Sequence, residues 1–279
     1  MNYYELTLKL AAFDTWHDIC VAYLAEHDYE SFVEETPNLK AYIQESLYDG
    51  AALQDLLKQL EVQGAGILGY DLMFLPQQNW NATWEAQFEP VLISDQLRIV
   101  APFHELPAFS GIEIKILPKM SFGTGHHQTT HLICQQMLQM DFQNKKVLDM
   151  GAGTGVLAIL AERLGAKAIT AIEIEAWSAE NILENMALNG SERIEAIHGG
   201  AEAITGNDFD IILANINKNV LLAQLPQYSA AMRTEGLLLL SGFFVTDVPD
   251  LKVAAAAVGF EPHGVFEREN WAVLLFKKP

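Results

Sequence analysis

A short glycine loop in the second half of the sequence has the residue types and spacing of a ligand-binding turn. Residues 147–150 (Val-Leu-Asp-Met) have the pattern of a buried strand and run directly into residues 151–155 (Gly-Ala-Gly-Thr-Gly), before an apolar helix. Glycines let the backbone turn tightly against a ligand, and the helix N-terminus adds free backbone N–H groups. A dinucleotide loop requires Gly where Val156 stands, and a Walker A loop requires a Gly-Lys-Ser/Thr sequence that does not follow.

The remaining common ligand for an acidic strand followed by such a loop is S-adenosylmethionine, because its adenosine and amino acid ends need no phosphate cradle. We therefore expect Gly151 and Gly153 to contact this cofactor, and Asp149 to reach toward its ammonium group through water or backbone. Glu173 ends the next expected strand, 22 residues after Gly151, where a carboxylate can accept both ribose hydroxyls. A lone acid at a strand end is usually a solvated cap, so the prediction depends on the loop and Glu173 together.

Asn215 ends the fourth expected strand of this half, within residues 210–217 (Asp-Ile-Ile-Leu-Ala-Asn-Ile-Asn). Ligands of doubly wound sheets lie at the carboxyl ends of the strands, near the reversal in strand order. Asn215 should then face the transferable methyl group, and its amide oxygen could orient an amine nucleophile. The alternative is that Asn215 only caps the helix that begins after it. Enzymes that methylate bases or glutamine often carry Asn-Pro-Pro-Tyr/Phe here, and this chain lacks that signature.

Residues 118–131 (Pro-Lys-Met-Ser-Phe-Gly-Thr-Gly-His-His-Gln-Thr-Thr-His) predict a glycine-containing turn that enters a helix just before the glycine-loop strand. This segment can fold over the cofactor, and its threonine hydroxyls can bind the cofactor or cap the helix. His127 and His131 share a helix face at i, i+4, as zinc ligands do. However, Gln128 replaces the glutamate of the zinc-protease motif and no third ligand is apparent, so we expect no metal.

The elements that must position these residues alternate between strand and helix from about Ser121 onward. Strands are expected at Lys146–Met150, Ala168–Ile174, Ile194–His198, Asp210–Ala214, Leu237–Ser241, Glu261–Glu267 and Ala272–Phe276, with helices at Val156–Leu164, Ala176–Asn189, Val220–Met232 and Asp247–Val258. Apolar strands that alternate with helices predict a mostly parallel sheet covered on both faces. The fold class is therefore α/β, a Rossmann-like doubly wound sheet.

The first 75 residues predict a smaller α+β domain. The expected elements are strands at Tyr4–Lys9, Tyr29–Glu35, Tyr42–Leu47 and Asp71–Leu75 and helices at Asp14–His27 and Gly50–Leu60. The order β-α-β-β-α-β is the ferredoxin-like pattern. A polar, Trp-containing linker with a short helix should follow at 76–90, and the cofactor-binding domain at 91–279, where Leu97–Ala101 and Ile112–Leu117 are the clearest early strands.

The charge and composition limit the partners. The formal net charge is −19, with 14 acidic residues and three lysines in the first 85 positions, so the surface repels phosphate backbones and we expect no direct nucleic acid binding. The acidic excess either serves solubility or attracts a basic protein. No apolar run is long enough to span a membrane, and the two distant cysteines, Cys20 and Cys134, fit a reducing cytoplasm.

Taken together, these motifs resemble the PrmA family, bacterial methyltransferases of ribosomal protein eleven of the large subunit. The resemblance covers about residues 90–279. The matching stretches are residues 122–130 (Phe-Gly-Thr-Gly-His-His-Gln-Thr-Thr), 147–155, 171–174 (Ala-Ile-Glu-Ile), 214–216 (Ala-Asn-Ile), 240–242 (Leu-Ser-Gly) and 269–271 (Glu-Asn-Trp). The first stretch is the most specific, because general methyltransferases do not carry it. The N-terminal domain matches only in size and element order.

The resemblance implies an enzyme that uses S-adenosylmethionine to methylate lysine side chains and the α-amino terminus of that basic ribosomal protein. We also expect a monomer in the cytoplasm. Its N-terminal domain would recognise the substrate. The cofactor-binding positions of the family correspond to Thr130, Gly151, Glu173 and Asn215, and we add Asp149, Gly153 and Phe122 to this expected set. The acid on the ribose is commonly Asp in the family and is Glu173 here.

The expected mechanism is direct in-line transfer from the sulfonium methyl group to a neutral amine. Asn215 and the carbonyl of Ala214 can orient the lone pair, and His126 or His127 could take the proton unless water suffices. Trp271 could wall the amine pocket or simply pack in the last strand pair. Two other functions stay open at this point: methylation of another protein or a small molecule, and cofactor-binding regulation without catalysis.

Overall fold

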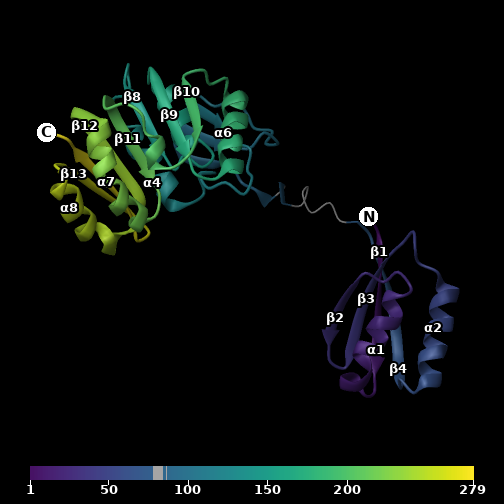
Figure 1. Ribbon diagram of the computed structural model, residues 1–279. Helices are drawn as coiled ribbons and strands as arrows, with labels where there is room; N and C mark the ends of the chain where they lie inside the picture. The colour runs from purple at the N-terminus through teal and green to yellow at the C-terminus, as the bar shows by residue number, and fades with distance from the viewer. Residues whose placement is uncertain (78–83, 86) are drawn as a thin grey trace. The chain divides into compact units, whose positions relative to one another are not determined.

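The computed structural model describes residues 1–77, 84–85 and 87–279, which belong to two compact units, Met1–Ala86 and Gln87–Pro279 (Figure 1). The short helix expected in the linker falls largely on residues 78–83 and 86, which lie outside the described residues. Within the described part of the chain, no helix is long and apolar enough to cross a membrane.

The N-terminal unit is a four-stranded sheet with two helices. Its elements are β1 (Tyr3–Leu10), α1 (Phe13–Ala25), β2 (Ser31–Glu35), β3 (Asn38–Gln44), α2 (Gly50–Gln63) and β4 (Ile67–Leu75). The strands lie in the order β2-β3-β1-β4, and every neighbouring pair is antiparallel. This element order and strand order confirm the ferredoxin-like prediction.

Buried and more exposed side chains alternate along β1 and β3 of this sheet, so one face of the sheet is buried and the other is more exposed. Leu6 and Leu8 of β1 are fully buried in a core that includes Leu24 of α1 and Leu56 of α2, so both helices cover that face. Strand β3 begins at Asn38, four residues earlier than expected. Leu39, Ala41 and Ile43 alternate as buried residues opposite β1, so pairing with β1 sets this boundary.

The C-terminal unit contains a seven-stranded sheet in the order β10-β9-β8-β11-β12-β14-β13. Its strands are β8 (Lys146–Met150), β9 (Ala168–Glu173), β10 (Ile194–His198), β11 (Phe209–Asn215), β12 (Met232–Phe244), β13 (Glu261–Arg268) and β14 (Trp271–Lys277). The first five are parallel, and β14 runs antiparallel to both β12 and β13. The strand order reverses at β8, which pairs with β9 on one side and β11 on the other. This arrangement confirms the Rossmann-like α/β prediction.

Helices cover both faces of this sheet (Figure 1). They are α4 (Gln128–Met137), α5 (Val156–Arg163), α6 (Ala176–Asn189), α7 (Lys218–Ala231) and α8 (Val248–Ala257). Val147 and Leu213 pack in the core shared with α4 and α5, whereas Leu148 and Ile212 pack in the core shared with α7 and α8. The sequences of these strands are therefore almost continuously apolar, because both faces of the sheet are buried.

A separate three-stranded sheet precedes the main one. It consists of β5 (Val91–Ser94), β6 (Leu97–Val100) and β7 (Ile112–Lys115), in that order. Asn189 of α6 ties β7 to the main domain, since its side chain accepts a bond from the Lys115 N–H at 2.9 Å and donates to the Lys115 carbonyl at 2.6 Å. The sheet therefore belongs to the larger unit and supports the segment that leads into α4.

Candidate active site

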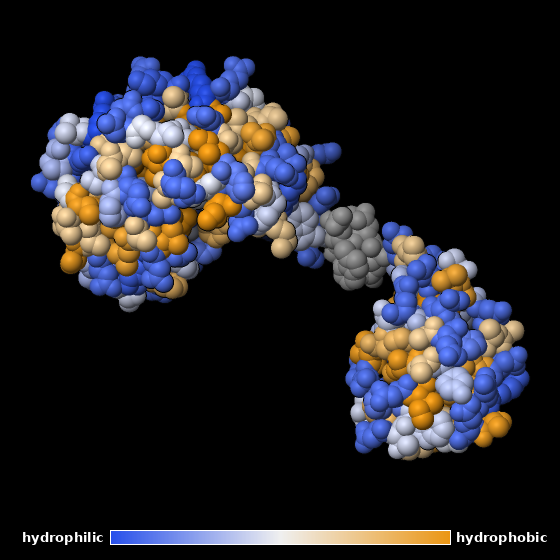
Figure 2. Space-filling view, viewed as in Figure 1, coloured by the Kyte–Doolittle hydropathy of each residue, from blue (hydrophilic) through white to orange (hydrophobic). Residues whose placement is uncertain are grey.

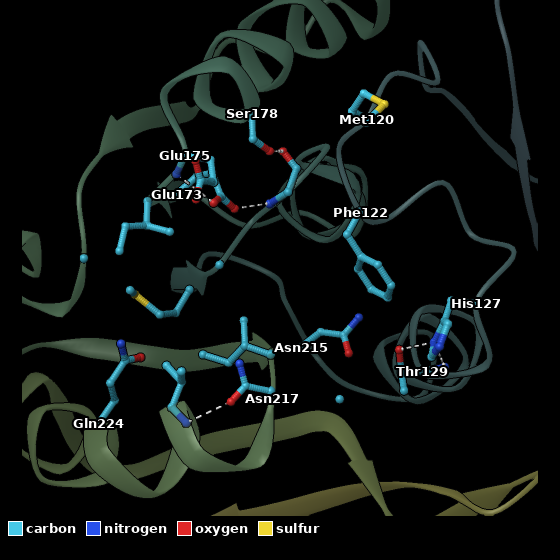
Figure 3. Close-up of a pocket in the computed structure, with 18 of the residues that line it drawn as sticks. Met120, Phe122, His127, Thr129, Glu173, Glu175, Ser178, Asn215, Asn217 and Gln224 are labelled. Atoms are coloured by element: carbon cyan, nitrogen blue, oxygen red, sulfur yellow. Dashed lines mark hydrogen bonds between the residues drawn. The ribbon is translucent and has the colours of Figure 1, made fainter. Parts of the chain in front are cut away.

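A cavity of about 540 Å³ lies at the carboxyl ends of β8, β9 and β11, and this volume lies in the usual range for a small-molecule site. Six of the expected site residues line it: Phe122, His127, Gly151, Gly153, Glu173 and Asn215. Three do not: His126, Thr130 and Asp149. Figure 3 shows Glu173 and Glu175 on one side of the cavity and His127 on the opposite side, with Asn215 between them.

The glycine loop has space for a backbone but not for side chains. Gly151 and Gly153 adopt φ values of +69° and +57°, in the left-handed region that favours glycine. A Cβ atom on Gly151 would lie 2.2 Å from Cγ2 of Ile216, and one on Gly153 would lie 2.2 Å from the carbonyl oxygen of Phe122. Both positions therefore require glycine for close approach as well as for backbone conformation.

Glu173 is held by backbone N–H groups on both carboxylate oxygens. Its Oε2 accepts from the Gly153 N–H at 2.8 Å, and its Oε1 accepts from the Glu175 N–H at 3.1 Å (Figure 3). The side chain is 8% exposed and lines the cavity. Each carboxylate oxygen has further lone-pair capacity, so the fixed carboxylate can accept two hydroxyl donors.

Asp149 differs from its expected placement. Its side chain is fully buried, and its Oδ2 accepts from the Ala158 N–H of α5 at 3.0 Å, while Oδ1 has no partner. Burial, opposed by the hydrogen bond from Ala158 and assisted by the nearby charge of Glu173, raises the pKa of this carboxyl group to about 7. Strand alternation places Asp149 on the same face as Val147, toward the core, so it anchors α5 beneath the loop and does not line the cavity.

Asn215 is positioned by a residue from α4. Its Nδ2 donates to Thr130 Oγ1 at 3.3 Å, whereas its Oδ1 is buried and has no partner. Thr130 is fully buried and does not line the cavity. The helix cap is Asn217, whose side chain accepts from the Val220 N–H at 3.2 Å at the start of α7. The structure therefore assigns capping to Asn217 and leaves Asn215, a residue that lines the cavity, with a buried side-chain oxygen that has no partner.

The segment before α4 is bonded to the glycine loop. The Phe122 carbonyl accepts from the Thr154 N–H at 2.9 Å, and the Gly123 carbonyl accepts from the Thr154 hydroxyl at 2.8 Å. These two bonds keep the Phe122 ring, which is 51% exposed, at the cavity wall. The position of this segment beside the site is therefore fixed by one backbone–backbone bond and one bond from the Thr154 hydroxyl.

The two histidines of this segment have different environments. His126 does not line the cavity: its Nε2 bonds to the Glu89 carbonyl at 2.9 Å, and its Nδ1 lies 3.1 Å from the Thr124 hydroxyl. His127 lines the cavity and caps α4, since its Nδ1 accepts from the Thr129 N–H at 3.3 Å. This bond leaves the ring proton on Nε2, and burial lowers the pKa of His127. Neither ring therefore presents a free basic nitrogen to the cavity.

Other cavity residues were not identified from the sequence. They include Met120, Ile174, Glu175, Trp177, Ser178, Asn217, Val220, Gln224 and Gly242. Ile174 and Trp177 lie one and four residues after Glu173 and are 66% and 45% exposed, so two large apolar side chains just after the acidic strand end were the signal that the sequence offered. Trp271 also lines the cavity, which supports the wall interpretation over simple strand packing. Among the described residues, no three His, Cys, Asp or Glu side chains form a metal-binding group.

The residues at this cavity fit S-adenosylmethionine in three independent respects. Gly151 and Gly153 present bare backbone to the cavity, Glu173 offers fixed acceptors for a pair of hydroxyls, and Asn215 holds an unpartnered oxygen nearby. No phosphate cradle is needed for this ligand.

Comparisons with known proteins show the family to which the chain belongs. The family model described as ribosomal protein L11 methyltransferase (PrmA) matches residues 14–279. Proteins named ribosomal protein L11 methyltransferase from Porphyromonas gingivalis and Phocaeicola vulgatus are 41% and 39% identical; they cover 98% and 99% of this chain, and 92% and 99% of their own lengths are matched. A crystal structure described as a ribosomal protein L11 methylase from Lactobacillus delbrueckii subsp. bulgaricus is similar with a TM-score of 0.64 at 29% identity, over 69% of this chain and 100% of that chain. The chain belongs to the ribosomal protein L11 methyltransferase (PrmA) family.

Proposed function

We propose that this protein transfers methyl groups from S-adenosylmethionine to amino groups of ribosomal protein L11, both lysine side chains and the N-terminal α-amine. The observation that carries the proposal is one cavity lined both by a fixed carboxylate, Glu173, on one side and by Asn215, whose amide oxygen has no partner. Family membership supplies the substrate and the class of reaction.

The cavity residues divide into a cofactor end and an acceptor end. We assign the ribose hydroxyls to Glu173 and the closest backbone approach to Gly151 and Gly153. Phe122 and Trp177 provide apolar surface beside them. When bound, S-adenosylmethionine supplies an electrophilic methyl group on a positively charged sulfur.

The acceptor amine must lose its proton before it can react. A lysine with a pKa of roughly 10.4 is neutral only about once in a few thousand molecules at pH 7. An apolar cavity wall disfavours the charged ammonium form and so raises the neutral fraction. Asn215 Oδ1 can accept one N–H of the neutral amine and thereby orient its lone pair. Both ring nitrogens of His126 bond elsewhere, and His127 accepts a bond at Nδ1 and carries its ring proton on Nε2, so we assign the proton of the amine to solvent.

We assign substrate recognition to the unit Met1–Ala86. On the sheet face opposite its helices, Glu5 lies beside Tyr42 and Met73 in register, and Met73 is 51% exposed. On this face the Lys40 charge is paired with Glu35 at 2.9 Å. The carboxylates of Glu5 and Asp71 outnumber the remaining lysine, Lys9, which leaves a net acidic surface with apolar positions. Figure 2 shows hydrophobic residues interspersed with hydrophilic ones on the visible side of this unit. Such a surface complements a basic ribosomal protein in charge.

A labelling experiment tests the proposal. The purified protein is incubated with methyl-labelled S-adenosylmethionine and total bacterial ribosomal proteins, and the labelled band is digested for mass spectrometry. We expect label in L11 alone, on lysine ε-amines and on the α-amine. Label in another ribosomal protein, or in small molecules only, would contradict the L11 assignment.

The same digest tests the finer part of the proposal. If L11 carries label only on side chains other than lysine, the enzyme methylates L11 but the amine assignment is wrong. We further propose that the enzyme acts as a cytoplasmic monomer, without bound nucleic acid, which sedimentation with and without RNA tests directly.

A further inference from the structure

Four aromatic rings from three separate segments form a continuous row that begins with Phe122, beside the glycine loop, and continues at the acceptor end of the cavity, the side where His127 lies opposite Glu173. The ring centroids of Phe122 and His127 are 5.1 Å apart, those of His127 and Trp271 are 4.7 Å apart, and those of Trp271 and Phe244 are 4.1 Å apart. Phe122 precedes α4, Phe244 ends β12 and Trp271 begins β14, where these last two residues are register partners. We call this row the aromatic wall. Phe122, His127 and Trp271 line the cavity directly.

The wall faces an acceptor end that lacks carboxylates. Among the described residues that line the cavity, the carboxylates are Glu173 and Glu175, and Figure 3 places both on the side opposite His127. A nitrogen that becomes positively charged at the acceptor end therefore meets aromatic rings and no fixed anion there. Ring faces attract cations by about 0.5–2 kcal/mol, and methyl groups on nitrogen pack against them without needing hydrogen-bond partners.

Hydrogen bonding at Asn215 changes with each methyl group added. In each transfer the nitrogen lone pair forms the N–C bond, the S–C bond breaks with its electron pair left on sulfur, and the nitrogen becomes cationic. A proton then leaves to solvent before the next transfer. A neutral primary amine has two N–H groups, a secondary amine has one and a tertiary amine has none, so Asn215 Oδ1 can orient the first two but not the third.

From this geometry we propose that the aromatic wall is the subsite for the methylated nitrogen, and that Trp271 determines how far methylation of each amine proceeds. The inference rests on the proposed amine methylation and extends it to the order of steps. Asn215 orients amines that still carry N–H groups, whereas the wall alone holds a tertiary amine and stabilises the positive charge that develops on it. Trp271 is central, because it contacts both His127 and Phe244.

A time course of product states tests this division. Wild type, Trp271→Leu and Phe244→Leu are compared on L11 with excess S-adenosylmethionine, and mono-, di- and trimethylated peptides are quantified by mass spectrometry. We expect Trp271→Leu to lower the third rate constant relative to the first by about tenfold, equivalent to the loss of roughly 1.4 kcal/mol, and Phe244→Leu to lower it by about threefold. Because Phe244 is 49% exposed, its replacement is compatible with folding.

A matched control is Phe266→Leu on the neighbouring strand β13. Phe266 packs against the core and does not line the cavity. Removing the ring there should therefore leave the ratio of the third methylation rate constant to the first unchanged. The proposal would be overturned if Trp271→Leu lowered all three rate constants by the same factor, or if it gave the same final methylation state as wild type. A wild type that stops at one methyl group would also overturn it while leaving amine methylation intact.

A binding measurement tests the wall without catalysis. Nε-trimethyllysine is added to the full-length protein, and saturation-transfer NMR follows magnetisation passed from protein aromatic protons to the trimethylammonium signal. We expect transfer in wild type and in Phe266→Leu and its loss in Trp271→Leu. Equal transfer in wild type and Trp271→Leu contradicts the wall, whether or not L11 proves to be the substrate.

Discussion

The carboxylate of Glu173 accepts a hydrogen bond of 2.8 Å from the backbone N–H of Gly153, so strand β9 and the glycine loop hold each other in place. Glu173→Gln replaces one of the two acceptor oxygens with a donor NH2 group. One backbone N–H, at Gly153 or Glu175, then loses its acceptor. We expect S-adenosylmethionine to bind about 10–100-fold more weakly, a loss of roughly 1.4–2.8 kcal/mol, as measured by isothermal titration calorimetry.

The matched control for this change is Glu180→Gln, which removes the same charge from an exposed position of α6. Cofactor affinity should stay within about twofold, because exposed charges are screened. Similar weakening in both variants would show that the net charge, and not the carboxylate geometry, controls binding.

Asn215 and Thr130 form a pair whose disruption should affect transfer more than cofactor binding. Asn215→Ala removes the acceptor oxygen, and Thr130→Val removes the hydroxyl that receives Asn215 Nδ2 at 3.3 Å. We expect kcat to fall by about 100-fold for Asn215→Ala and about tenfold for Thr130→Val, with the cofactor Kd changed less than about threefold. Thr130→Ser keeps the hydroxyl and should restore most of kcat. Parallel losses in kcat and cofactor affinity would assign Asn215 to cofactor binding instead.

Gly153 and Gly190 provide a matched pair for separating backbone strain from steric contact. Both adopt positive φ, +57° and +62°, but a Cβ at Gly153 would meet the Phe122 carbonyl at 2.2 Å, whereas one at Gly190 meets nothing within 4 Å. Gly190→Ala should cost about 1 kcal/mol of unfolding free energy from backbone strain alone. Gly153→Ala should cost about 1–3 kcal/mol more, because the Phe122 segment must move.

Chemical denaturation of both glycine variants measures this difference, and calorimetry should show weaker cofactor binding in Gly153→Ala alone. Equal losses of unfolding free energy in the two variants would mean that the Phe122 segment can move aside at almost no cost in free energy.

His127 should act as a helix cap and not as the general base. Asn is a good capping residue, so His127→Asn should keep the unfolding free energy within about 0.5 kcal/mol, whereas His127→Ala should lose about 1 kcal/mol. If His127 were the base, both variants would lose kcat by about 100-fold or more. Steady-state kinetics on the two variants separates these roles.

The position of His127 at the helix cap also predicts how the unfolding free energy changes with pH. Because burial lowers the pKa of His127, the native state holds fewer protons than the unfolded state just below pH 6.5. The His127 contribution to stability is therefore present above the unfolded pKa and is lost as the pH falls through the lowered folded value. His127→Asn should remove this part of the acid sensitivity, as denaturation midpoints across pH 5–8 would reveal.

The sequence alone was sufficient for the features that depend on short-range patterns. The glycine loop, the acid at the end of β9 and the alternation of strands with helices are local, so the α/β sheet, the ferredoxin-like unit and six of the cavity residues could be predicted. The boundary of β3 could not, because long-range pairing with β1 decides it.

Tertiary structure decided what each polar side chain at the site does. Thr130 and Asn215 lie on different elements far apart in the sequence, and only the packing of α4 beside β11 brings them into contact. The Asp149 side chain points into the core because strand alternation places it on that face, where a backbone N–H of α5 donates a hydrogen bond to its carboxylate. Trp271 reaches the cavity because β14 pairs antiparallel with β12, which places its ring beside His127 and Phe244. The sequence determined which residue types were available, and long-range packing determined which of their atoms remain free to act.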